Sequence, residues 1–242
     1  MLNILLIAGH GGNDPGNVDF GKREADLARE FVTLLQRELL TYDCTCGVYN
    51  MARSMYHDLF VEGFYYNFKP YDYVFEVHFN AYKKDEGDGK NKGTEIYVPN
   101  AEKITTVEGN ILTAMSSLGF TNRGIKKKDF SVIAEAKRQG ASSALFEVCF
   151  MDDADDMKIY NDKKTDIIAK VAKAIADGYN IKRKEGVSVS FSDIQTHWAK
   201  KEIEKVASAG IINGYADNSF KPDKPVTRAE LAAVISRLMD KR

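Results

Sequence analysis

The sequence predicts an α/β protein with a mixed, largely parallel sheet flanked by helices, followed by a small, mostly helical C-terminal module. Residues 2–8 form a short, continuous apolar run, which is typical of a strand that is buried on both faces. Segments with strand and helix patterns then alternate, which favours parallel strands joined by crossover helices. Near residue 180 a basic and then small, polar stretch begins, and the pattern changes after it.

Each element of the first domain is predicted from its own pattern. Strands are read from short apolar or alternating runs, and helices from apolar residues that recur every three or four positions. The predicted strands cover residues 2–8, 44–49, 71–79, 94–98 and 144–150. The predicted helices cover residues 21–40, 55–68, 101–118 and 167–179. Residues 83–92 are expected to form a charged loop, and residues 126–128 a solvated surface.

The C-terminal module is expected to hold two short helices, around residues 198–209 and 227–239. Thr227 and Glu230 have the spacing of a capping box at the start of the second helix. We therefore divide the chain into a domain at 1–180, a linker at 181–190 and a module at 191–242.

Composition excludes several classes of protein. The 242 residues include 34 Lys and Arg against 35 Asp and Glu, and this balance argues against nucleic-acid binding. No apolar run approaches the roughly 18 residues of a membrane-spanning helix, so we expect no membrane insertion. Residues 2–8 lack the basic flank and cleavage site of a signal peptide. With three cysteines in no disulfide pattern, we expect synthesis in the reducing cytoplasm.

Four ionisable residues lie where the predicted topology brings chain segments together. His10 follows the first strand, His78 lies near the end of the third, and Glu24 opens the first helix. In an open α/β sheet, ligands bind outside the carboxyl ends of the strands. Two imidazoles and one carboxylate form a known catalytic Zn²⁺ ligand set. Each histidine alone is more often structural, and Glu24 alone suits a first helical turn, so the hypothesis depends on their combination.

Glu147 is the charged residue that most needs an explanation, because it lies inside the apolar run 144–150. A carboxylate in such a strand loses its hydration, and the free-energy cost is high unless a metal, a proton or a cation compensates for it. Burial raises the pKa of a carboxyl group, which suits proton transfer to and from water. An ion pair with an arginine is the alternative.

Five segments, GHGGNDPG, READLA, VHFNA, GTEIYV and ALFEVCFMDD, resemble in this order the zinc-dependent N-acetylmuramoyl-L-alanine amidases of the amidase-3 family. The resemblance covers residues 2–180. It implies that His10, Glu24 and His78 bind Zn²⁺ and that Glu147 is the general base and acid. The implied reaction is hydrolysis of the amide between N-acetylmuramic acid and the L-alanine of the peptidoglycan stem peptide.

Two positions depart from the family pattern. The family often has serine two residues before its second histidine, where this chain has Glu76. It often has glycine two residues after the catalytic glutamate, where this chain has Cys149. Since neither is a ligand position, we expect these departures to affect the fit of the substrate rather than the chemistry.

Residues 191–242 resemble a single S-layer homology module, with the segments FSD, HWA, GIINGYADNSFKP and VTRAE. Such modules hold proteins to secondary cell-wall polysaccharide. The resemblance implies that Arg228 contacts an anion of this polymer, with Trp198 and Asp193 near the glycan. A core position for Trp198 and a helix-to-loop contact for Arg228 are the alternatives. Because one module of about 50 residues buries little core, we expect a homo-oligomer formed through this module.

The two resemblances together predict a peptidoglycan hydrolase that is anchored to the cell wall. The lack of a signal peptide favours a phage or prophage endolysin that acts at the wall after holin-type release. A bacterial autolysin exported by a non-classical route is the alternative within the same class. A non-catalytic cell-wall-binding protein is the competing hypothesis from a different class, and a metallopeptidase that cuts within the stem peptide is a third.

Overall fold

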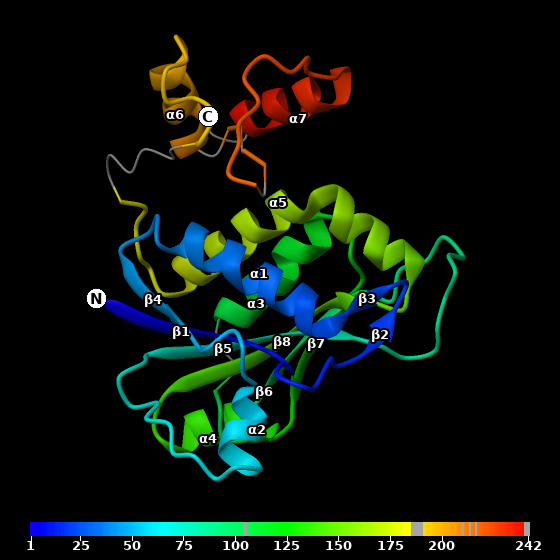
Figure 1. Ribbon diagram of the computed structural model, residues 1–242, viewed down its shortest axis with the longest axis vertical. Coiled ribbons are helices and arrows are strands. Elements are labelled where there is room, and N and C mark those ends of the chain that lie inside the picture. Colours follow the sequence, from blue (N-terminus) through cyan, green and yellow to red (C-terminus); the bar gives the residue numbers. More distant parts are fainter. Residues whose placement is uncertain (104–105, 185–190, 210, 213, 216, 240–242) are drawn as a thin grey trace. The chain divides into compact units, whose positions relative to one another are not determined.

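The computed structural model describes the 242-residue chain except for residues 104–105, 185–190, 210, 213, 216 and 240–242 (Figure 1). The chain divides into two compact units, Met1–Arg183 and Lys184–Arg242. Most of the predicted linker at 181–190 lies outside the described residues. Among the helices that are described, none is long and apolar enough to cross a membrane.

The first unit is built on a six-stranded sheet with the order β4-β1-β5-β8-β6-β7. Its strands are β1 (Leu2–Ala8), β4 (Cys44–Val48), β5 (Tyr73–Asn80), β6 (Thr94–Val98), β7 (Asn122–Lys127) and β8 (Ser142–Phe150). The pairs β1·β4, β1·β5, β5·β8 and β6·β7 are parallel, and only β6·β8 is antiparallel. A separate ribbon joins β2 (Val18–Asp19) to β3 (Lys22–Arg23). The predicted mixed, largely parallel sheet is therefore confirmed.

Helices cover both faces of this sheet (Figure 1). One face carries α1 (Glu24–Leu39), α3 (Thr106–Ser117) and α5 (Ala154–Gly178), and the other carries α2 (Met55–Phe60) and α4 (Ser131–Arg138). The pattern did not predict α4, and α5 begins thirteen residues before the predicted start at 167. Asp153 explains the early start, because its side chain accepts a hydrogen bond from the Asp156 backbone N–H and caps the helix.

The edge strand β7 was also not predicted, and the expectation of a solvated surface at 126–128 is wrong for Lys126. This strand is mostly polar because one side of it lies at the open edge of the sheet. Lys126 Nζ lies 2.5 Å from Glu95 Oε2, and Glu95 is 2 % exposed. Lys126 is therefore the partner of a buried carboxylate.

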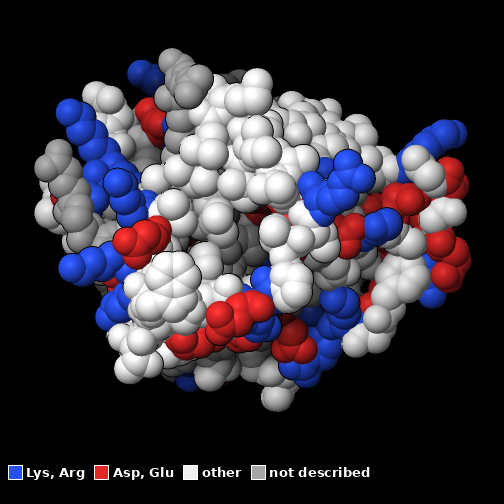
Figure 2. All heavy atoms as spheres, turned by 90° about the horizontal axis from the view of Figure 1, so that it is seen from above, with Lys and Arg blue, Asp and Glu red and all other residues white. Residues whose placement is uncertain are grey.

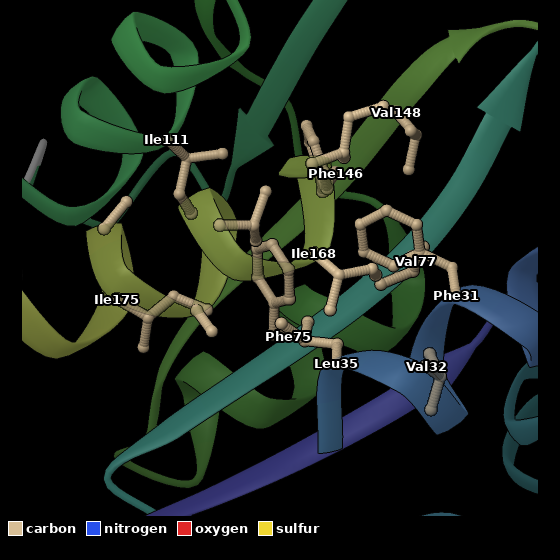
Figure 3. Close-up of a cluster of buried hydrophobic side chains, with 14 of the residues drawn as sticks. Phe31, Val32, Leu35, Phe75, Val77, Ile111, Phe146, Val148, Ile168 and Ile175 are labelled. Atoms are coloured by element: carbon tan, nitrogen blue, oxygen red, sulfur yellow. The ribbon is translucent and has the colours of Figure 1, made fainter. Parts of the chain in front are cut away.

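Strand alternation divides the side chains of β5 between the two faces of the sheet. Phe75 and Val77 pack with Phe31 of α1 and Phe146 of β8 in the main core, which Figure 3 shows in detail. His78 lies between Val77 and Phe79 in sequence, so its side chain points to the opposite face, where α2 and α4 lie. The same alternation directs polar side chains of β5 and β8 toward one another on that face.

The second unit contains α6 (Lys200–Ser208) and α7 (Arg228–Met239), as expected for a small helical module. Its buried cluster consists of Phe191, Ile194, Ile203 and Ala207. The capping box of α7 is formed in both directions: Glu230 N–H donates to Thr227 Oγ1 at 3.2 Å, and Thr227 N–H donates to Glu230 Oε2 at 2.7 Å. Apolar side chains of α7 are exposed, namely Leu231, Ile235, Leu238 and Met239.

Candidate metal and catalytic site

The fold brings His10, Glu24 and His78 together, and one ligand atom from each lies within 4.8 Å of the others. His10 Nε2 lies 3.1 Å from Glu24 Oε1, and His78 Nδ1 lies 2.8 Å from the same oxygen. His10 follows β1 and has a φ of 61°, a left-handed conformation that turns its side chain back toward α1. Two imidazole nitrogens and one carboxylate oxygen therefore converge on one point.

The Glu24 carboxylate is held by the surrounding chain. Glu24 is 2 % exposed, and its Oε2 accepts hydrogen bonds from the backbone and side-chain amides of Asn17 at 3.1 and 2.7 Å. Phe79 N–H donates to Oε1 at 3.2 Å. Burial opposes ionisation, but the hydrogen bonds with His10 and His78 outweigh it and hold the pKa of Glu24 well below its usual range. Glu24 is therefore ionised at neutral pH and provides the negative charge that a bound cation requires.

The carboxylate of Glu24 changes the pKa values of both imidazoles. Burial by itself lowers the pKa of a histidine, because it disfavours the charged ring. Burial is the largest single cause for both rings, but the hydrogen bonds and negative charges of the nearby carboxylates, Glu24 first among them, together outweigh it and raise the pKa values of His10 and His78. The carboxylate of Glu24 thus favours positive charge on both rings.

Arg29 of α1 supports the loop that carries His10. Its guanidinium donates five hydrogen bonds to backbone carbonyls, at distances of 2.6–3.3 Å. The acceptors are the carbonyls of Gly9, His10, Ala25, Met51 and Arg53. This residue was not predicted from the sequence. One feature of the sequence could have indicated it: Arg29 lies four positions after Ala25, so a charged residue shares a helix face with an apolar one.

Glu147 lies opposite His78 in the register of β5 and β8. Its Oε2 is buried and has no hydrogen-bond partner among the described residues. Burial is the largest cause that raises the pKa of Glu147, to about 7, while the nearby His78 opposes this and the neighbouring carboxylates of Glu24 and Glu95 add to it. Near neutral pH this group exchanges a proton easily. No arginine pairs with it in the described part of the chain, in contrast to the ion-pair alternative.

These four residues line one pocket of about 400 Å³ on the α2 and α4 side of the sheet. Met55 and Tyr56 of α2 form one wall, and residues 130–132 at the start of α4 form another. The pocket is partly open to solvent, and Tyr56 in its lining is 53 % exposed. Glu147 is thus part of the lining of a pocket that solvent can enter.

The two departures from the family pattern differ in position. Glu76 lines the pocket and is 5 % exposed. Cys149 is fully buried in the main core, on the side of α1, α3 and α5. The expectation that Cys149 affects substrate fit is therefore wrong, because its thiol packs against apolar side chains away from the pocket.

A second group of possible metal ligands, His57, Asp58 and Glu62, lies around α2. Arg53 occupies it: its guanidinium lies 2.5 Å from Asp58 Oδ1 and 2.8 Å from Glu62 Oε2. One guanidinium therefore contacts both carboxylates, with two hydrogen bonds to Asp58 and one to Glu62.

The three predicted polymer-binding residues of the second unit have different environments. Trp198 is 87 % exposed, so it is not a core residue of the module. Arg228 is the first residue of α7 and is exposed. The Asp193 carboxylate accepts hydrogen bonds from the backbone N–H groups of Phe220 and Lys221 at 2.8 and 2.7 Å. Asp193 therefore stabilises a turn of the module.

Neither sign of charge dominates the face that Figure 2 shows. Basic and acidic side chains both occur around its rim. This mixture agrees with the near-equal numbers of basic and acidic residues in the sequence.

Comparison with known proteins places most of the chain in one family. The family described as N-acetylmuramoyl-L-alanine amidase matches residues 4–180. The sporulation-specific N-acetylmuramoyl-L-alanine amidase of Bacillus subtilis is 24 % identical over 222 residues, which cover 89 % of this chain and 83 % of that protein. The solved structure of N-acetylmuramoyl-L-alanine amidase AmiC2 of Nostoc punctiforme has a TM-score of 0.59 and 16 % identity, and the match covers 74 % of this chain and 97 % of that one. It shows that the fold is shared.

The second unit matches a different family. The S-layer homology domain matches residues 190–232. Exoglucanase XynX of Acetivibrio thermocellus is 47 % identical over 53 residues, which cover 22 % of this chain. That match spans only 5 % of the relative's own length, so it concerns the module alone.

Proposed function

Because this chain belongs to the N-acetylmuramoyl-L-alanine amidase family, we propose that it hydrolyses the amide bond between N-acetylmuramic acid and the L-alanine of the peptidoglycan stem peptide. The convergence of His10, Glu24, His78 and Glu147 in one pocket carries this proposal. A protein that only binds the cell wall has no need for a half-buried carboxyl group whose pKa is about 7 beside such a cluster.

The cofactor that fits this site is Zn²⁺. His10 and His78 supply imidazole nitrogens and Glu24 supplies a carboxylate oxygen, which is a donor set found in catalytic zinc sites. When bound, Zn²⁺ polarises a carbonyl group and lowers the pKa of water toward neutrality. The chain leaves the pocket side of this cluster open to the substrate.

Glu147 performs the proton transfers. Its carboxylate takes a proton from the water that attacks the scissile carbonyl carbon. The same carboxyl group then donates this proton to the leaving nitrogen of L-alanine as the C–N bond breaks, so that Glu147 returns to its starting state. A pKa of about 7 suits both steps, because the group is neither too weak a base nor too weak an acid at neutral pH.

The C-terminal module anchors the hydrolase to the cell wall in this proposal, through secondary cell-wall polysaccharide. The exposed indole of Trp198 can stack on a sugar ring, and the exposed guanidinium of Arg228 can pair with an anionic group of the polymer. The carboxylate of Asp193 is engaged with the backbone, so it acts by shaping the module.

Self-association through the module is part of the same proposal. The buried cluster of the module is small, and α7 exposes Leu231, Ile235, Leu238 and Met239. A second copy of the module that covers these side chains removes apolar surface from water. The expected result is a mass above that of the monomer at micromolar concentration. The endolysin role, and the autolysin alternative, stay predictions of the sequence.

The substitution Glu147→Gln tests the enzymatic part of the proposal. It preserves the shape of the side chain and removes its ability to carry the proton. We expect the variant to bind one zinc ion per chain and to lose at least 10²-fold in the rate of wall hydrolysis, the usual contribution of a general acid–base. Turnover close to that of the wild type, at equal zinc content, removes Glu147 from this role.

A further inference from the structure

Each histidine of the cluster has a second carboxylate near the ring nitrogen that does not face Glu24. His10 Nδ1 lies 2.7 Å from Asp14 Oδ2, on the side of the ring that faces away from Glu24. For His78 the corresponding contact joins Nε2 to Glu76 Oε1, at 3.4 Å, while Nδ1 faces Glu24 at 2.8 Å. The two imidazoles therefore present different nitrogens to the common point, Nε2 from His10 and Nδ1 from His78.

We propose that Glu76 is a positioning residue for the metal centre, which holds the His78 ring so that Nε2 carries the proton and Nδ1 faces the metal. This inference rests on the zinc site of the proposed function. It assigns a role to a residue that lines the pocket but belongs neither to the ligand set nor to the proton transfer.

The chemistry of imidazole explains why such a residue matters. A neutral ring has one protonated nitrogen and one lone pair, and only the lone pair binds a metal. The hydrogen-bond partner of one nitrogen thus decides which nitrogen is free for the metal. When a cation occupies the common point, Nδ1 gives up any proton it shares with Glu24, and the carboxylate of Glu76 at Nε2 favours the tautomer that keeps its proton on Nε2.

The backbone fixes this arrangement. Glu76 and His78 are two residues apart on β5, so their side chains leave the same face of the sheet. Glu76 is 5 % exposed, and a carboxylate buried to this degree needs a donor such as the His78 N–H. On its other side the ring packs directly against Gly9, where a Cβ atom would lie only 2.5 Å from Nε2 and 2.6 Å from Nδ1. Gly9 therefore limits the movement of the ring on one side, and Glu76 is the carboxylate that faces its Nε2.

The carboxylate of Glu76 also provides what a neutral hydroxyl group at this position could not. A carboxylate accepts a stronger hydrogen bond from an imidazole N–H than a hydroxyl does. It increases the electron density that His78 offers to a cation. We therefore expect the metal affinity of this chain to depend on Glu76.

The test measures zinc affinity and the protonation of the His78 ring. Zinc dissociation constants are obtained by competition with a chromophoric chelator for the wild type, Glu76→Gln and Glu76→Ala. We expect Glu76→Ala to weaken zinc binding by about 10- to 100-fold. Glu76→Gln should weaken it less, because its amide oxygen still accepts a hydrogen bond from Nε2–H. In ¹⁵N NMR spectra of the zinc-loaded wild type, His78 should show a protonated Nε2 and a metal-bound Nδ1.

Glu102→Gln is the matched control. Glu102 is also 5 % exposed and is also paired, with Lys137 Nζ at 2.9 Å and the Ser143 backbone N–H at 3.1 Å. Its substitution should lower stability without changing the zinc dissociation constant. If Glu76→Ala does not fold, the isosteric Glu76→Gln variant and the NMR assignment still decide the question.

The outcomes separate the two hypotheses. Unchanged zinc affinity in both Glu76 variants, or zinc bound to His78 Nε2 in the wild type, overturns the role of Glu76 and leaves the amidase proposal intact. A loss of wall hydrolysis at full zinc affinity also overturns it, because Glu76 then acts on the substrate. A wild-type chain that binds no zinc removes the metal centre of the proposed function, and the role of Glu76 with it.

Discussion

Substituting Gly9 by alanine should disable the metal site while the fold remains intact. The added methyl carbon would lie 2.5 Å from His78 Nε2 and 2.6 Å from Nδ1, and it would also overlap Cε1. Ordinary contact begins near 3.4 Å, so the ring has to move by about 1 Å. The backbone itself tolerates alanine, because Gly9 is not among the residues with positive φ. The hydrogen bond from the Gly9 N–H to the Val77 carbonyl is also retained in the variant.

The expected loss follows from this displacement. A misplacement of about 1 Å at a catalytic centre costs on the order of 10²-fold in rate, which corresponds to about 2.7 kcal/mol. We expect Gly9→Ala to lower the rate of wall hydrolysis by this amount and to weaken zinc binding. The assay combines the metal content after dialysis with the initial rate of hydrolysis of purified cell walls, at equal protein concentration.

Gly109→Ala serves as the control for this prediction. Gly109 lies within α3, and a Cβ atom there would meet nothing within 4 Å. Alanine should therefore raise stability slightly, by about 0.5–1 kcal/mol, with no effect on zinc binding. If Gly9→Ala retains wild-type zinc affinity and hydrolyses walls within about twofold of the wild-type rate, the packing of His78 against Gly9 does not determine the metal site.

Three further predictions concern stability and wall binding. The folded-state pKa of Glu147, about 7, exceeds its ordinary value of 4.5, so the folded protein retains a proton that the unfolded chain has lost between these pH values. In the metal-free protein, the free energy of unfolding of Glu147→Gln should exceed that of the wild type by at most about 3 kcal/mol at pH 8 and should equal it below pH 4.5. If urea denaturation gives the same difference between the two proteins at every pH, this prediction is wrong. Arg29→Lys should lower the free energy of unfolding by about 2–4 kcal/mol, because lysine leaves some of these backbone carbonyl groups without a hydrogen-bond donor. If urea denaturation shows that the free energy of unfolding falls by less than about 0.5 kcal/mol, the carbonyl groups have found other partners. Trp198→Ala should reduce co-sedimentation with cell walls at an unchanged melting temperature, whereas Asp193→Ala should lower that temperature; unchanged sedimentation would exclude a role for the indole.

The sequence predicted the central part of the sheet because those strands are apolar on one or both faces. β1, β5 and β8 lie within the sheet, and continuous apolar or aromatic runs marked all three. β7 has only one apolar side chain, Ile125, because it is an edge strand, so no periodic pattern identified it. The helix α4 has only eight residues, too few for a clear helical period.

The candidate site was predictable because parallel topology determines which chain segments meet. His10 and His78 follow or end neighbouring strands, so their proximity required no knowledge of side-chain conformation. Their supporting contacts were not predictable in the same way. The bonds of Arg29 to five carbonyls and the approach of Glu76 to His78 depend on loop conformation and on side-chain rotamers, which a sequence pattern does not encode.

Digestion of purified Gram-positive cell walls, with and without a zinc chelator, tests the central claim most directly. New amino termini and new reducing sugar ends are quantified in the same samples. We predict the release of L-alanine amino termini that the chelator abolishes and that added zinc restores, with no increase in reducing ends. Walls that bind the zinc-loaded protein but yield no new L-alanine termini would contradict the claim and identify a wall-binding protein.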